Sequence, residues 1–94
     1  MIDETMDGEQ VTVKGWINEV RNLGGIKFII LRTEGQLIQI TLPESKVDKE
    51  IFKKVEKLGN EDVITVKGTL NKTEKSDLGI EIIPEKINTI SKAI

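Results

Sequence analysis

Hydrophobic and polar residues alternate along five stretches of the chain, which are separated by short segments rich in glycine and polar residues. A period of two is typical of a β-strand with one face on a core, because successive side chains point to opposite faces. Glycines such as Gly24, Gly25 and Gly35 fall between the stretches and favour strand connections. The predicted strands cover residues 10–20, 26–32, 37–42, 62–73 and 79–90.

The period changes between the third and fourth predicted strands. Residues 47–58 place their apolar side chains three or four positions apart, which predicts an α-helix with one buried face. Asp48 or Ser45 can cap its start, and Gly59 is expected at the C′ position that ends it. The residues of the predicted buried face are Val47, Ile51, Val55 and Leu58.

The order of three strands, one helix and two strands indicates a single all-β domain over residues 1–94. Gly15 interrupts the long first strand as a bulge or a sharp bend would, and Gly68 stands late in the fourth. The fifth strand is expected to bend or break at Pro84. Because bent strands let a small sheet close, we expect a five-stranded OB-fold barrel with the helix between strands three and four. Another small five-stranded barrel is the alternative.

The charge distribution separates one segment from the rest of the 94 residues, whose formal net charge is −2. A protein that binds nucleic acid through phosphates alone is normally basic, and this chain is not. The basic excess coincides instead with the segment that carries Phe28. Residues 11–33 hold one acid and four bases, and the bases are Lys14, Arg21, Lys27 and Arg32.

Cysteine and histidine are absent, which removes disulfides, thiolate ligands, the usual general base and the usual zinc ligand. We therefore expect no metal, no cofactor and no catalysis. Glu61 and Asp62 are adjacent carboxylates, but their place in a polar turn predicts solvated side chains. The sequence has no apolar run of about 18 residues and begins with acidic residues rather than a signal peptide. We expect a cytoplasmic protein with no membrane partner.

Alternation on the second and third predicted strands places an aromatic and an amide side chain on the face opposite the core. These are Phe28 and Gln39. An exposed aromatic ring can stack on a nucleobase, which is worth about 1–3 kcal/mol per base. A neighbouring amide can read the Watson–Crick edge of that base. Arg21 and Arg32 can pair with phosphate or stack.

The same pattern also fits a plainer interpretation, in which Phe28 packs under the first-strand turn and Gln39 is an ordinary surface residue. The pattern alone favours neither. Trp16 stands at the bend of the first strand, and its bulk suits burial, so we expect a core residue rather than a stacking surface. Lys14 and Lys27 are expected on the surface, where they can steer a phosphate backbone.

Residues 11–41, VTVKGWINEVRNLGGIKFIILRTEGQLIQIT, carry several motifs in order: G-W, an arginine before L-G, a phenylalanine, L-R and a glutamine. This run resembles the N-terminal anticodon-binding domain of aspartyl-tRNA synthetases. Asparaginyl and lysyl enzymes share part of the pattern. Residues 61–70 and 79–91 resemble the last two strands of that domain. The residues that match without a gap are Gly15, Trp16, Arg21, Leu23, Gly24, Phe28, Leu31, Arg32, Ile38 and Gln39.

The resemblance implies roles for several residues of this chain. Phe28 would stack on the central anticodon base, and Gln39 would hydrogen-bond that base. Arg21 would contact the anticodon, and Glu81 in the last strand would help to read a neighbouring base. The hairpin RTEGQ departs from the family pattern because its glycine stands one place early, so its tip is expected to differ in shape.

The expected function is recognition of the tRNA anticodon loop, of aspartate or asparagine type, as one module of a homodimeric synthetase. Motifs of the catalytic domain are absent from these 94 residues, so we expect no aminoacylation by the chain alone. Two alternatives stay open. One is a free-standing OB-fold that binds single-stranded nucleic acid with little sequence preference, and the other is an OB-fold domain, natural or engineered, that binds another protein.

Overall fold

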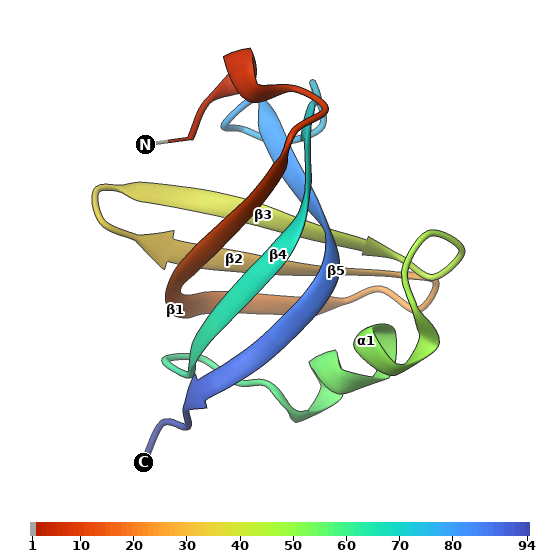
Figure 1. Cartoon of the computed structure of the whole chain (residues 1–94). Helices are drawn as coiled ribbons and strands as arrows, with labels where there is room; N and C mark the ends of the chain where they lie inside the picture. Colours follow the sequence, from red (N-terminus) through yellow and green to blue (C-terminus); the bar gives the residue numbers. More distant parts are fainter. Residues whose placement is uncertain (1) are drawn as a thin grey trace.

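A computed structural model gives the structure of the chain and describes residues 2–94. Its five strands form a closed barrel in the order β1-β2-β3-β5-β4 (Figure 1). A short helix lies between β3 and β4, so the five-stranded OB-fold barrel predicted from the sequence is confirmed. The elements are β1 Gln10–Asn22, β2 Ile26–Thr33, β3 Gln36–Pro43, α1 Lys49–Lys54, β4 Val63–Lys72 and β5 Ile80–Ser91, with a 3-10 turn η1 at Glu4–Met6 and another, η2, at Val55–Lys57.

Strand pairing closes the barrel around an aliphatic interior. β1 pairs antiparallel with β4 up to Trp16 and with β2 from Trp16 onward, so one strand serves both halves of the sheet. The last contact is a short parallel pairing of β3 with β5, at Ile40 and Ile82. Full burial of an aliphatic side chain stabilises the fold by about 1.5–3 kcal/mol. Interior side chains without exposed surface include Ile17, Ile29, Leu31, Ile40, Leu42, Ile64, Val66 and Ile82.

Two glycines allow the backbones of neighbouring strands to approach very closely. A Cβ atom added at Gly15 would lie 2.3 Å from the carbonyl oxygen of Arg32 on β2. One added at Gly68 would lie 2.2 Å from the carbonyl oxygen of Ile83 on β5. β5 continues through Pro84, which lies opposite Gly68 at a shift in register, so this strand is bent rather than broken. No larger residue fits at either glycine without moving the backbone.

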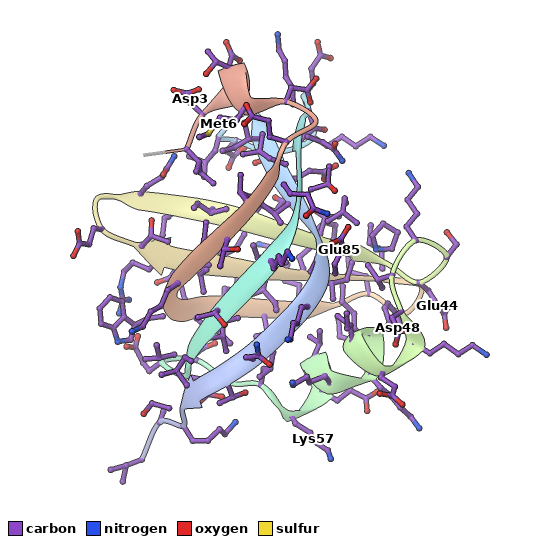
Figure 2. All side chains as sticks on the ribbon, in the orientation of Figure 1. Asp3, Met6, Glu44, Asp48, Lys57 and Glu85 are labelled. Carbon is purple, nitrogen blue, oxygen red and sulfur yellow. The ribbon has the colours of Figure 1, made fainter. Side chains whose placement is uncertain are left out.

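The helix after β3 is shorter than predicted. α1 covers six residues instead of 47–58, and the 3-10 turn Val55–Lys57 continues it. Asp48 caps its start as predicted, because its carboxylate accepts a hydrogen bond from the N–H of Glu50 at 2.8 Å (Figure 2). Leu58 is the C-cap of this 3-10 turn, so Gly59 stands at the predicted C′ position, although without the positive φ that glycine often adopts there. No helix in the part of the chain that the structure describes is long and apolar enough to cross a membrane.

Lys27 is 3% exposed, so the prediction of a surface lysine is wrong. Its Nζ donates to the carbonyl oxygen of Phe52 at 2.8 Å and lies 4.1 Å from the centre of the Phe52 ring. The Glu56 carboxylate is 3.7 Å away. A buried ammonium needs such partners, because its hydration is lost. Lys27 therefore joins β2 to the helix and does not face a phosphate.

The carboxylate of Asp62 joins the turn before β4 to the last residues of the chain. Asp62 is 2% exposed, so the prediction of a solvated side chain is wrong for it. It accepts hydrogen bonds from the N–H of Ala93 at 2.8 Å, from Lys92 Nζ at 2.5 Å and from the N–H of Gly59 at 2.9 Å. These hydrogen bonds, that from Ala93 first, lower the pKa of Asp62 to about 2. The charged form therefore stabilises the fold.

Gly68→Ala is expected to lower the free energy of unfolding by about 1–3 kcal/mol, because the added methyl group overlaps the backbone of β5. Urea unfolding followed by circular dichroism measures the change. Gly25→Ala is the matched control, since its Cβ meets no atom within 4 Å and its φ is not positive. We expect less than about 0.5 kcal/mol there. Equal losses in the two variants would contradict the close approach as the cause.

The free energy of unfolding is expected to fall as the pH is lowered from about 4 to about 2. Above the ordinary pKa of 3.8, Asp62 is charged in the folded and unfolded states, and its native hydrogen bonds contribute in full. Below that value the unfolded chain takes up the proton first, so the contribution is lost progressively until the folded pKa of about 2 is reached.

Asp62→Asn tests this dependence when unfolding is measured at a series of pH values. The hydrogen bonds that Thr5 donates also lower the pKa of Asp3, so the informative quantity is the difference between wild type and variant. We expect the variant to be less stable at neutral pH and to lose less stability between pH 4 and 2. An undiminished loss in the variant would show that Asp62 does not control this range.

Candidate nucleic-acid interface

The outward side chains of β1, β2 and β3 form one continuous surface, which we call the strand face. Residues paired across antiparallel strands point to the same face, so the strand register determines which side chains are neighbours on the strand face. Phe28 on β2 lies opposite Arg21 on β1 and Thr41 on β3. Two further rows follow toward the β2–β3 hairpin, first Glu19, Ile30 and Gln39, and then Trp16, Arg32 and Leu37.

A groove of about 690 Å³ runs over the strand face. Its other wall is formed by the β4–β5 connection and the adjoining ends of those strands. Four of the five predicted site residues line it, namely Arg21, Phe28, Gln39 and Glu81, whereas Arg32 does not. The structure thus brings four of these residues together. Their contact with nucleic acid stays a prediction.

The floor of the groove presents an aromatic ring beside an amide. Phe28 is half-buried, which leaves part of its ring open to the groove. Gln39 donates a hydrogen bond from Nε2 to the hydroxyl oxygen of Thr41 at 3.0 Å. Thr41 is itself buried, so this hydrogen bond fixes the direction of the amide. The side-chain oxygen of Gln39 has no hydrogen-bond donor within residues 2–94 and is available to a base.

The charges in the groove are balanced. Arg21 forms an ion pair with Glu19 on the same strand, and both side chains are exposed. Such a pair adds little stability and exchanges readily for another anion. Three cationic and three anionic side chains line the groove: Arg21, Lys46 and Lys75, and Glu19, Asp77 and Glu81. Within residues 2–94 no three His, Cys, Asp or Glu side chains gather as metal ligands.

Trp16 and Arg32 pack against each other outside the barrel. The guanidinium carbon of Arg32 lies 5.7 Å from the centre of the Trp16 ring, and its Nη2 pairs with the Glu61 carboxylate at 3.0 Å. Trp16 is 44% exposed, so the prediction of a core residue is wrong. The reason is alternation: Gly15 and Ile17 are buried, which turns Trp16 outward despite its size. Arg32 accordingly lies beside the groove.

The loop of residues 73–79 supplies groove residues that the sequence patterns did not predict. A hydrogen bond from the N–H of Thr73 to the carbonyl oxygen of Gly79, at 2.9 Å, closes this loop. Ser76 is buried within it and accepts a hydrogen bond from the N–H of Leu78, which borders the groove. The letters EKSD carry no motif. The loop could have been predicted from the fold instead, because the connection between strands four and five flanks the face of strands two and three in OB-folds.

The β2–β3 hairpin turns tightly at its tip. Glu34 and Gly35 connect the strands, and Gly35 adopts the left-handed conformation with a φ of 72°. Thr33 Oγ1 donates to the carbonyl oxygen of Gln36 at 3.1 Å, and Gln36 Nε2 donates to the carbonyl oxygen of Ile2 at 2.8 Å. The tip therefore contacts the N-terminal segment, and these residues do not line the groove.

A closed five-stranded barrel with a helix between β3 and β4 and an aromatic ring open to a groove over β2 and β3 defines an OB-fold of the nucleic-acid-binding class. The chain belongs to the OB-fold nucleic acid binding domain family tRNA_anti-codon, whose sequence profile matches residues 11–90. Within that family it corresponds to the N-terminal anticodon-binding domain of aspartyl-tRNA synthetases, so the resemblance seen in the sequence is confirmed.

Two ligases illustrate the likeness in sequence. The chain is 53% identical over 92 residues to the aspartate–tRNA(Asp) ligase of Pyrococcus abyssi, which covers 98% of this chain and 21% of the ligase. It is 51% identical over 87 residues to the aspartate–tRNA(Asp/Asn) ligase of Methanopyrus kandleri, which covers 93% of this chain and 20% of the ligase. The chain thus spans about a fifth of these enzymes, and the match leaves out their catalytic domain.

Solved structures show the same architecture. Asparaginyl-tRNA synthetase from Pyrococcus horikoshii, complexed with asparaginyl-adenylate, superimposes with a TM-score of 0.87 at 27% identity, over 97% of this chain and 21% of that one. OBody AM3L09, bound to hen egg-white lysozyme, superimposes with a TM-score of 0.91 at 30% identity, over 98% of this chain and 91% of the OBody.

Proposed function

We propose that this chain binds the anticodon loop of a tRNA and reads its central base in the strand-face groove. The observation that carries the proposal is the convergence of Arg21, Phe28, Gln39 and Glu81 on one groove. The family supports it, because its profile is that of tRNA anticodon domains. Unpaired loop bases are the part of RNA that proteins read most readily, by stacking and by hydrogen bonds to base edges.

In this proposal the central base lies flat on Phe28 with its edge toward Gln39. The amide offers a donor and an acceptor, which suits the mixed edge of an unpaired base. Because Thr41 already holds the amide at 3.0 Å, little side-chain freedom is lost on binding. Arg21 exchanges its exposed partner Glu19 for a phosphate of the loop.

Recognition of a neighbouring base is assigned to Glu81 on β5. Glu81 lies opposite Asn71 on β4, and both side chains line the groove. A carboxylate accepts hydrogen bonds only, so it selects a base edge that carries amino or imino N–H groups. Asn71 supplies both a donor and an acceptor beside it. This pair therefore adds discrimination next to the central base.

Aspartate-type tRNA is the proposed partner, and asparagine-type tRNA is the second candidate. The support is that ligases named for tRNA(Asp) and for tRNA(Asp/Asn) match the chain at 53% and 51% identity. On the same resemblance we place the chain as the RNA-reading module of a homodimeric aspartate–tRNA ligase in the cytoplasm. Aminoacylation would belong to the catalytic domain of that enzyme.

Protein binding is a second candidate function, favoured by one observation. OBody AM3L09, which shares this fold with a TM-score of 0.91, is bound to a protein, hen egg-white lysozyme. A protein-binding role predicts no affinity for anticodon stem-loops. A free-standing binder of single strands predicts equal affinity for all loop sequences. Titration with a cognate stem-loop and with loops altered at one base separates the three functions.

Gln39→Ala is expected to weaken binding of the cognate stem-loop by about 1–3 kcal/mol, because a base contact is lost. With a loop altered at the central base the loss should be small, since the contact is already absent there. Phe28→Ala should weaken every loop, because stacking accepts any base. Fluorescence anisotropy of labelled stem-loops measures the affinities.

Residue and base together form a double-mutant cycle, which cancels general damage to the fold. Gln10→Ala is the matched control, because Gln10 is an exposed glutamine that pairs with Glu85 outside the groove. It should leave all affinities unchanged. Equal losses for Gln39→Ala on cognate and altered loops would refute its role as the reader.

Binding by this chain is expected to be weak and only moderately sensitive to salt. Three cationic side chains line the groove, so a slope of log K against log[salt] no steeper than about −2 is expected. Lys75→Ala should make the slope shallower by about 0.7 for all loops. Lys86→Ala, outside the groove, should not change it. Tight binding that persists in high salt would contradict this balance of charges.

A further inference from the structure

We propose that Trp16, Arg32 and Leu37 form a second stacking surface, which takes a loop nucleotide other than the one held at Phe28. This inference rests on the proposed function and extends its footprint. The three residues make up one row of the strand face, with Arg32 paired to Trp16 on one side and to Leu37 on the other. The row is built on three different strands.

Exposure distinguishes this row from a packed surface. Trp16 is 44% exposed and Leu37 is 42% exposed, so two large apolar side chains stand open on either side of a guanidinium. Arg32 is held in place by Glu61 at 3.0 Å and by the side-chain oxygen of Asn18 at 3.4 Å. A flat ring with a fixed guanidinium 5.7 Å from its centre offers two π-surfaces to a base.

The second stacking surface continues the groove. Asn18 and Leu37 line the groove that also holds Phe28, and Arg32 hydrogen-bonds to Asn18. Phe28 and Arg32 are four residues apart on one strand, a distance of about 14 Å. The base that stacks on Phe28 cannot reach that far. A flanking nucleotide of the same RNA strand is therefore the occupant that the geometry fits.

An exposed cation lies close to Trp16 on β1. Lys14 precedes Trp16 by two residues on β1, is exposed, and forms no ion pair within residues 2–94. It can therefore meet a phosphate without giving up a partner. Proteins bind single-stranded nucleic acid with this combination, in which aromatic rings and guanidinium groups stack on bases and cations contact the phosphates.

A protein partner is the competing occupant. Trp16 also borders a hollow of about 850 Å³, lined by Ile2, Lys14, Val63 and Ile90 among others. That hollow lies away from Phe28 and Gln39, which do not line it. Continuity with the groove through Asn18 and Leu37, and the guanidinium group of Arg32, favour RNA over an apolar protein segment. The experiment below separates the two.

Trp16 is the single tryptophan of the chain, so its fluorescence reports on this surface alone. The 94-residue protein is titrated with the anticodon stem-loop, and with stem-loops in which one loop nucleotide at a time is abasic. We expect quenching of Trp16 fluorescence by the intact loop, and loss of the quenching for one abasic position other than the central one. Trp16→Leu should weaken binding of the intact loop by on the order of tenfold. It should weaken binding of that abasic loop far less.

Ile90→Ala is the matched control, since Ile90 is an exposed apolar residue of the hollow but not of the strand face. Its RNA affinity should equal that of wild type. A loop that binds in a Phe28-dependent way but leaves Trp16 fluorescence unchanged would overturn the second stacking surface and leave the proposed function standing. Equal losses from Ile90→Ala and Trp16→Leu would also overturn it, in favour of the hollow. Absence of any RNA binding would overturn both proposals.

Discussion

The close approach of strand backbones at Gly15 and Gly68 is the constraint on which the rest of the barrel depends. β1 changes its partner from β4 to β2 at Trp16, directly after Gly15, and a side chain at Gly15 would meet the carbonyl oxygen of Arg32 at 2.3 Å. This change of partner lets the sheet close, and closure places β5 beside β3. Glu81 reaches the same groove as Phe28 for that reason alone, since an open sheet would leave β5 at a distant edge.

Within the closed barrel, side chains alternate between the core and the surface along each strand. This alternation separates the residues that stabilise the fold from those that can contact a ligand. Inward positions are mostly aliphatic and buried, whereas Lys27 is a buried cation whose ammonium donates to the carbonyl oxygen of Phe52 and joins the helix to β2. Outward positions carry the ring, the amide and the guanidinium groups. Because each set lies on its own face, the outward residues can be changed with little effect on the core. Binding energies of the strand face can therefore be measured on a folded protein.

The sequence predicted the strands, their order and the outward direction of Phe28 and Gln39, because the period of two and the glycines are local signals. The predictions were wrong where the type of a residue was given more weight than its position in the alternation of its strand. Trp16 was expected inside for its bulk, and Lys27 outside for its charge, yet both follow the alternation of their strands. A side chain in a paired strand cannot turn to the other face. The loop of residues 73–79 is closed by its own hydrogen bond from Thr73 to Gly79, and Lys54 at the end of α1 donates to the carbonyl oxygen of Ile87 on β5. Neither feature follows from a periodicity of apolar residues.

The two arginines of the chain share a feature that bears on specificity. Arg21 pairs with Glu19 and Arg32 with Glu61, so a phosphate that approaches either arginine must displace a carboxylate. This lowers the affinity for every RNA alike, because phosphates carry no sequence information. The base-edge contacts proposed for Gln39 would not be reduced by this competition, and they would carry a larger share of the remaining binding energy. A groove with balanced charges therefore favours discrimination over affinity. Much of the affinity for a whole tRNA would then come from contacts outside this domain. The ligase of Pyrococcus abyssi is about five times as long as this chain and could supply them.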